Sequence, residues 1–215
     1  MPTRPARPLP CEGGPIGCET PRPRRSVAVA LGRLGQAGSN QIIQGTAPWF
    51  TVAVIRDTTE DDWRLLRTIR LRALQDSPDS FASDYGAEVR HNERQWREWL
   101  RSDMWLLAFE SGTAPAPVGI IAATREPSAP AGEPFLSSLW VDPWYRRRGI
   151  AKGLVEAAAE RVAAAGATAV SLWVLDGNEA ARRFYAAIGF VPTGERQLAP
   201  GSWDLHERRM RRTVR

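Results

Sequence analysis

The stretch that decides the fold is Leu139-Trp140-Val141-Asp142-Pro143-Trp144-Tyr145-Arg146-Arg147-Arg148-Gly149-Ile150-Ala151-Lys152. Five of the seven residues over 135–141 are apolar or aromatic, which predicts a strand that ends at Asp142-Pro143. Residues 149–165 are rich in Ala, Leu, Val and Glu and contain no proline, which predicts a helix that Gly166 ends. The stretch is therefore a strand, a basic loop and a helix N-terminus.

This arrangement suits an anion. The first N–H groups of a helix have no partner within the helix, and the helix dipole places positive charge at the same end. Gly149 and Ala151 are small enough for a ligand to approach the backbone. The guanidinium groups of Arg146 to Arg148 can form charged hydrogen bonds with phosphate. We predict a phosphate site, although a solvated basic turn before an ordinary helix would show the same residues. Neither a Walker loop nor a Rossmann fingerprint is present.

Outward from this join, the pattern predicts an α/β fold. Thr59 with Asp62 opens one helix that ends near Asp76, and Asn92 opens a second. The helix over 149–165 lies between two parallel strands and so forms a βαβ unit in a mixed, mostly antiparallel sheet flanked by helices. The predicted strands are residues 51–56, 104–110, 118–124, 135–141, 169–175, 189–192 and 205–213.

A second motif comes after the parallel unit. It reads Asn178-Glu179-Ala180-Ala181-Arg182-Arg183-Phe184-Tyr185-Ala186-Ala187-Ile188-Gly189-Phe190. Asn178 is a good cap for a helix over residues 178–188. Tyr185 follows Phe184 on this amphipathic helix, so a place in the core is one reading of it.

Together the two motifs resemble those of the GNAT acetyltransferases. Arg146-x-x-Gly149-x-Ala151 is similar to the pyrophosphate loop of that family, and Asn178 to Phe190 is similar to the motif that closes its cofactor site. The resemblance runs from about Val52 to Arg212 and implies the GNAT fold. Many relatives have Gly where Arg147 stands, so we expect Arg147 to point to solvent and to offer only its N–H.

The resemblance implies an N-acetyltransferase that moves acetyl from acetyl-CoA, the acyl-donor cosubstrate, to a primary amine by direct attack. Both cysteines lie outside residues 51–215, so no cysteine there offers a covalent intermediate. Tyr185 is implied as the acid that protonates the leaving thiolate, and Trp140 as a wall of the acyl pocket. No metal is expected. The implied cofactor-binding residues are Leu139, Trp140, Val141, Arg146, Arg147, Arg148, Gly149, Ile150, Ala151 and Asn178.

The general base and the acceptor stay open. Glu133 stands where some relatives place a carboxylate, but a glutamate in a surface loop is the favoured interpretation. Asp84, Tyr85 and Glu88 lie in the region that often forms the acceptor wall, and many members use ordered water. A protein N-terminus, a lysine, a polyamine, an amino acid and an antibiotic are all candidate amines.

Composition divides the chain into two parts. Residues 1–50 hold eight of 17 prolines, seven of 18 glycines and six arginines against two glutamates, which predicts a disordered tail before a domain over 51–215. That domain keeps 23 basic and 22 acidic residues, so its charge is nearly balanced. Cys11 and Cys18 lie in the tail, and no apolar run approaches the ~18 residues of a membrane span. We expect a cytoplasmic protein without a membrane partner, either monomer or homodimer.

Two other functions compete with catalysis. The first is a non-catalytic acyl-CoA-binding regulatory domain on the same fold, because fold does not fix function. The second is a nucleic-acid-associated protein that uses the tail and the run Arg208-Arg209-Met210-Arg211-Arg212. Because the domain is nearly neutral, we expect no nucleic-acid partner.

Overall fold

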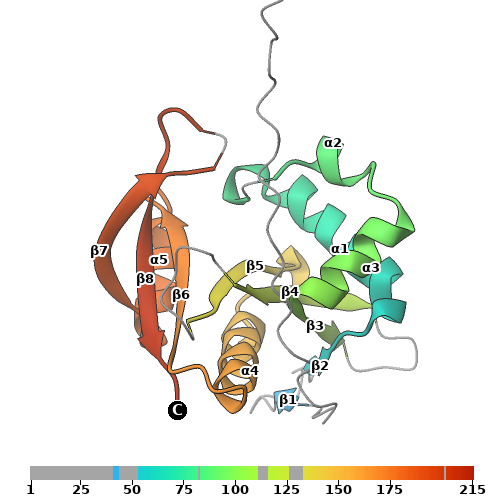
Figure 1. Ribbon diagram of the computed structural model, residues 1–215, viewed down its shortest axis with the longest axis horizontal. Helices are drawn as coiled ribbons and strands as arrows, with labels where there is room; N and C mark the ends of the chain where they lie inside the picture. Colours follow the sequence, from blue (N-terminus) through green and yellow to red (C-terminus); the bar gives the residue numbers. More distant parts are fainter. Residues whose placement is uncertain (1–40, 44–52, 82, 111–115, 126–132, 201) are drawn as a thin grey trace, which may run out of the picture.

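The computed structural model describes residues 41–43, 53–81, 83–110, 116–125, 133–200 and 202–215, which form one mixed sheet with its flanking helices (Figure 1). The strand order of the sheet is β1-β2-β3-β4-β5-β6-β8-β7. Neighbours pair antiparallel except β5 with β6, which are parallel. The strands are β1 (Gln41–Ile43), β2 (Ala53–Asp57), β3 (Met104–Glu110), β4 (Pro117–Thr124), β5 (Phe135–Val141), β6 (Ala169–Leu175), β7 (Val191–Leu198) and β8 (His206–Thr213).

Helices cover both faces of the sheet. Strand alternation sends Leu106 and Ala108 of β3 toward a core shared with α4, and Leu107 and Phe109 toward a core shared with α1 and α3. Residues of α5 pack against the α4 core. The α-helices are α1 (Trp63–Asp76), α2 (Tyr85–Glu88), α3 (Glu93–Ser102), α4 (Ile150–Ala164) and α5 (Glu179–Ala187), and the 3₁₀ helices are η1 (Glu60–Asp62), η2 (Pro78–Ser80) and η3 (Pro143–Tyr145).

Side-chain caps fix where the helices begin. The Asp62 carboxylate accepts from Thr59 N–H at 2.8 Å, although the first turn is 3₁₀ rather than α. Asn92 and Gln95 exchange hydrogen bonds of 2.9 and 3.1 Å at the start of α3. Asn178 accepts from Ala181 N–H at 3.0 Å at the start of α5. These three predicted starts are confirmed.

The predicted α/β architecture, a mixed and mostly antiparallel sheet with one parallel βαβ unit, is confirmed. Three details differ. Strand β7 runs to Leu198 instead of ending near Pro192, and the single turn of α2 has no counterpart in the prediction. Strand β1 falls within residues 1–50, where no regular element is expected; the rest of that range, with both cysteines, lies outside the described residues, so the boundary at residue 50 stays a prediction. Among the described residues, no helix is long and apolar enough to cross a membrane.

We predict that Asp103→Asn stabilises the fold more at neutral pH than in acid. Burial raises the pKa of Asp103 to about 6, although a hydrogen bond from Ser102 opposes the shift. An acid whose pKa is higher in the folded chain contributes its stability below the unfolded pKa of 3.8 and loses it as the pH rises through about 6. The stability gained by the variant should therefore be about 2 kcal/mol larger at about pH 7.5 than at about pH 4.5.

Urea unfolding of the variant and the wild type at both pH values measures this difference. A gain that stays constant between them would show that Asp103 does not titrate there.

Candidate active site

The parallel strands β5 and β6 separate along most of their length, and we call this opening the splay. Each strand has seven residues, yet their only register pair is Phe135 with Ser171. Ser171 N–H donates to Pro134 O at 3.1 Å at the closed end. Beyond that point, the edge of β5 that faces β6 has backbone groups free to pair with an extended ligand.

A bulge in β5 sets the direction of that edge. Ala122 of β4 pairs with Ser137, but Ile120 pairs with Trp140, so β5 carries one extra residue between them. Ser138 within the bulge has φ 59°, a left-handed conformation that is rare for serine. Asp142 N–H donates back to Val118 O of β4 at 2.9 Å. Because backbone direction alternates along a strand, Val141 and Leu139 present their backbone groups to the splay, whereas Trp140 faces β4.

The β5–α4 loop lies at the open end of the splay. Gly149 is the N-cap of α4 with φ 79°, and Arg147 is left-handed as well, with φ 64°. Arg147 is exposed, as expected. Arg148 lies over the Tyr145 ring, 5.2 Å from its centroid, and the Tyr145 hydroxyl donates to Glu110 at 2.6 Å. The hydrogen bond to Glu110 is the main reason that the pKa of Tyr145 is raised.

Arg146 turns its side chain toward α1. Its Nε donates to Val141 O at 2.9 Å, and its Nη2 forms an ion pair with Asp76. Burial opposes ionisation of Asp76, but hydrogen bonds from Trp140, Ser77 and Arg146 lower its pKa below the ordinary value. The Arg146 side chain therefore ties the loop to α1, which leaves the backbone N–H groups and the two following arginines as the groups that face outward.

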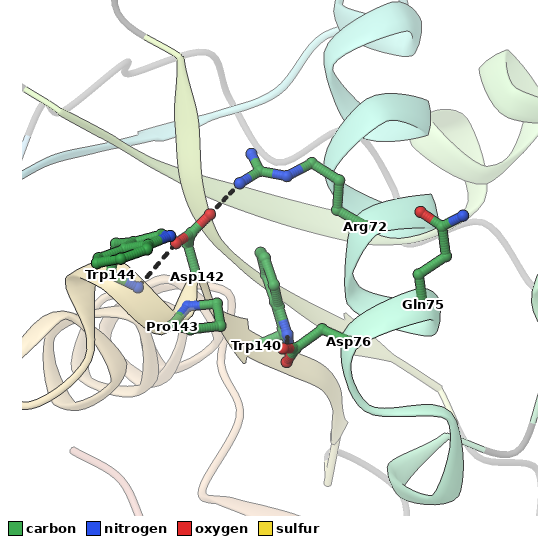
Figure 2. A pocket seen from close by; sticks show the side chains of 7 residues that line it. All are labelled: Arg72, Gln75, Asp76, Trp140, Asp142, Pro143 and Trp144. Carbon is green, nitrogen blue, oxygen red and sulfur yellow. Dashed lines mark hydrogen bonds and ion pairs between the residues drawn. The ribbon is translucent and has the colours of Figure 1, made fainter.

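A cavity of about 360 Å³ opens between α1 and this loop (Figure 2). Trp140 is buried against α1, its Nε1 donates to Asp76 at 2.9 Å, and its ring lines the cavity. Asp142 forms an ion pair with Arg72 and accepts from Trp144 N–H at 2.9 Å, which closes the turn of η3. Trp144 itself is 84% exposed at the rim.

Tyr185 and Asn178 lie on the α5 side. The Tyr185 ring packs between Phe184 and Phe190, with centroids 5.1 and 5.5 Å away. It contacts the core that also contains Leu139 and Val141. Burial raises the pKa of Tyr185 and so keeps the phenol protonated. The side-chain oxygen Oδ1 of Asn178 accepts from Ala181 N–H and so caps α5.

Glu133 differs from its favoured interpretation. It is 7% exposed rather than part of a surface loop, and it pairs with Arg209 at 3.1 Å and Arg211 at 2.8 Å. Arg209 also donates to Ser171 at 3.0 Å, so this network closes the narrow end of the splay. Of the other candidates, Asp84 caps α2 and Glu88 is paired with Arg70. Within the described residues, no three His, Cys, Asp or Glu side chains gather as a metal site.

Sequence reasoning missed several residues that shape this site. Arg70 lies on the buried stripe of α1 with Leu66, Ile69 and Ala73, and a charge at such a position signals a buried partner. Ser138 gave no signal, because serine is rarely left-handed. In the sequence Asp76 indicates only the end of a helix, because its partner Arg146 is distant in the chain and comes beside it only in the folded protein.

The comparisons with known proteins agree on one family. A model of the acetyltransferase (GNAT) family matches residues 69–190, more than half of the chain. An acetyltransferase of the GNAT family from Streptococcus pneumoniae is 22% identical with a TM-score of 0.62, over 76% of this chain and 99% of that one. YncA from Salmonella typhimurium, solved with its cofactor acetyl-CoA, is 16% identical with a TM-score of 0.60, over 76% and 94%.

The ribosomal-protein-S18-alanine N-acetyltransferase from Escherichia coli is 17% identical with a TM-score of 0.55, over 75% of this chain and 94% of that one. At these identities the structures share the fold, and nothing more follows from them. No curated protein matches the sequence.

We predict that Gly149→Ala destabilises the domain through backbone conformation alone. A Cβ at Gly149 meets no atom within 4 Å, but φ of 79° is unfavourable for any residue with a Cβ. The expected loss is about 1–2 kcal/mol. Gly177→Ala is the matched control, because that position is equally open without a left-handed φ and should change stability by less than about 0.5 kcal/mol. Equal losses in urea unfolding would contradict the conformational explanation.

Proposed function

The chain belongs to the acetyltransferase (GNAT) family, and from this premise we propose that it transfers acetyl from acetyl-CoA to a primary amine by direct attack. The observation that carries the proposal is the splay, since β5 and β6 meet only at Phe135 and Ser171. An extended pantetheine arm has donors and acceptors spaced to pair with an open strand edge. Leu139 and the N–H of Val141 offer that edge, because the Val141 carbonyl already accepts from Arg146. Trp140 contributes its side chain.

The loop before α4 suits the pyrophosphate of the same ligand. α4 is 15 residues long and begins directly after its N-cap Gly149, so its first N–H groups lie where the loop turns. Ile150 and Ala151 supply two of these groups. Arg147 and Arg148 add charge, while Arg146 holds the loop through Asp76.

The proposed reaction forms one bond and breaks one. The neutral amine nitrogen attacks the thioester carbon, and negative charge develops on the carbonyl oxygen while the nitrogen becomes positively charged. The nitrogen gives one proton to water, the carbon–sulfur bond breaks, and the thiolate that leaves is protonated to the free thiol. We propose that the Leu139 N–H, which follows the bulge, donates to the carbonyl oxygen. Tyr185, which packs against the same core as Leu139, donates to the sulfur in this proposal.

The raised pKa of Tyr185 suits it to this task. Because burial raises the pKa of the phenol above its ordinary value of about 10, the phenol keeps its proton at neutral pH. A phenol holds its proton more tightly than a thiol does, with ordinary pKa values of about 10 and about 8.5. Tyr185 therefore stabilises the charge on sulfur chiefly as a hydrogen-bond donor, and any proton that it gives to the thiolate is replaced, through water, by the proton that the attacking nitrogen loses.

The carboxylates that the sequence offers as bases are all engaged. Glu133 pairs with two arginines, Glu88 with Arg70, and Asp84 caps α2. We therefore propose that water removes the proton from the incoming ammonium. A small molecule or a peptide supplies the amine.

The arginine run near the C-terminus has structural partners. Arg208 pairs with Asp176 at 2.6 Å, and Arg212 pairs with Glu156 at 2.9 Å. Arg209 and Arg211 share Glu133. These ion pairs favour catalysis over a nucleic-acid-associated function, because each arginine of the run already has a carboxylate partner within the domain.

We predict that the purified protein binds acetyl-CoA and releases free thiol when a suitable primary amine is added. Native mass spectrometry tests the first step, and a panel of amino acids, polyamines, lysine peptides, N-terminal peptides and aminoglycosides with a thiol reagent tests the second. Thiol release that needs both substrates supports transfer. Binding without release from any amine would favour the non-catalytic acyl-CoA-binding domain.

We predict that Tyr185→Phe lowers kcat about 100-fold, within the range expected for loss of a general acid. The substitution keeps the ring contacts to Phe184 and Phe190, so the affinity for acetyl-CoA should stay within about twofold of wild type. Calorimetric titration with acetyl-CoA and steady-state kinetics measure the two quantities. Unchanged turnover would remove Tyr185 from the mechanism while leaving the cofactor site in place.

A further inference from the structure

Arg70 and Glu88 form a buried ion pair on the α1 side of the sheet. Arg70 is 7% exposed and Glu88 1% exposed. Two parallel bonds join them, from Nε to Oε2 at 3.0 Å and from Nη2 to Oε1 at 2.8 Å. Phe81 lies against the guanidinium, which is 4.7 Å from its ring centroid. This geometry fixes the guanidinium plane from α2 and the segment before it.

The remaining guanidinium nitrogen reaches the bulge of β5. Arg70 Nη1 donates to the Ser138 hydroxyl at 3.1 Å. Ser138 is the residue with φ 59°, and a left-handed backbone is unfavourable for a residue with a Cβ. A charge-assisted bond from a held guanidinium is among the stronger polar contacts in a protein. One buried charge therefore connects α1, α2 and the strained residue of β5.

The strained residue controls the direction of the rest of β5. Before the bulge Ala122 pairs with Ser137, and after it Ile120 pairs with Trp140. The Leu139 side chain consequently joins Leu136 and Val141 in the α4 core, and its backbone turns toward the splay. If Ser138 returned to an ordinary strand conformation, the N–H of Leu139 would rotate away from that direction.

We infer that Arg70, held by Glu88, is a positioning residue for acetyl transfer. It keeps Ser138 left-handed and thereby aims the Leu139 N–H at the thioester carbonyl oxygen, on which negative charge develops. The inference rests on the proposed function. Arg70 itself contacts neither substrate, and its effect passes through the hydroxyl of Ser138.

Ser138→Ala tests this role with the smallest change, because it removes only the oxygen that Arg70 bonds. We expect kcat to fall about tenfold, less than the loss of a whole oxyanion donor, while the affinity for acetyl-CoA stays within about threefold. The carbonyl stretching band of bound acetyl-CoA labelled with ¹³C should move to higher frequency, because the carbonyl is less polarised. Ser137→Ala, one residue earlier on the same strand, should leave kcat and the band unchanged.

A second variant tests whether Arg70 acts through Ser138. Arg70→Met with Glu88→Met removes both buried charges together, a replacement that folded proteins tolerate better than loss of one partner. It should lower kcat as Ser138→Ala does, and adding Ser138→Ala to it should cause no further loss. Should the double replacement fail to fold, Ser138→Ala with its infrared band decides alone.

The outcomes separate the inference from the function on which it rests. Wild-type kinetics and an unmoved carbonyl band in Ser138→Ala would overturn the positioning role. Additive losses in the combined variant would also overturn it, because Arg70 would then act by another route. A wild-type protein that neither binds acetyl-CoA nor releases thiol would instead overturn the proposed function.

Discussion

The contact between Phe135 and Ser171 is the constraint on which the rest of the structure depends. A parallel pair of seven-residue strands normally forms a continuous ladder, because unpaired backbone groups inside a sheet are unfavourable. Here the ladder stops at its first step. The network of Glu133, Arg209 and Ser171 closes the narrow end, and α4 and α5 cover the wider end from one side. A sheet built in this way keeps the splay open between β5 and β6.

Two buried ion pairs connect the elements around the splay. Arg209 with Glu133 joins β8 to the start of β5, and Arg70 with Glu88 joins α1 and α2 to its bulge. Buried ion pairs contribute little net stability, because desolvation offsets much of the attraction. Their directional bonds, however, select one arrangement among several that an apolar core would accept. These two buried ion pairs therefore fix the relative positions of the strands and helices around the splay more than they stabilise the fold.

Local sequence determines much of this fold, and for identifiable reasons. Caps such as Asn92 and Asn178 act within one helical turn, and the apolar run of β6 is continuous in the sequence, so both could be predicted. The single turn of α2 depends on the bond between Asp84 and Ala87 and on the buried Glu88, which needs Arg70. The length of β7 depends on its pairing with β8, because its own residues are all exposed. Burial of Glu133 likewise needs arginines 76 and 78 residues away.

The two halves of the candidate site differ in the same way: one depends on residues that are neighbours in the sequence, and the other on partners that are far apart in it. The cofactor half uses backbone groups at a strand edge and a helix start, which Gly149, Ala151 and the spacing of regular elements encode locally. The other half is lined by side chains whose partners lie in other elements, as Arg70 shows with Glu88 and Ser138. A motif can describe the first because it is continuous in the chain. The half lined by side chains changes whenever one distant partner residue is substituted. The same fold can therefore keep one cofactor while the residues that line the acceptor side differ.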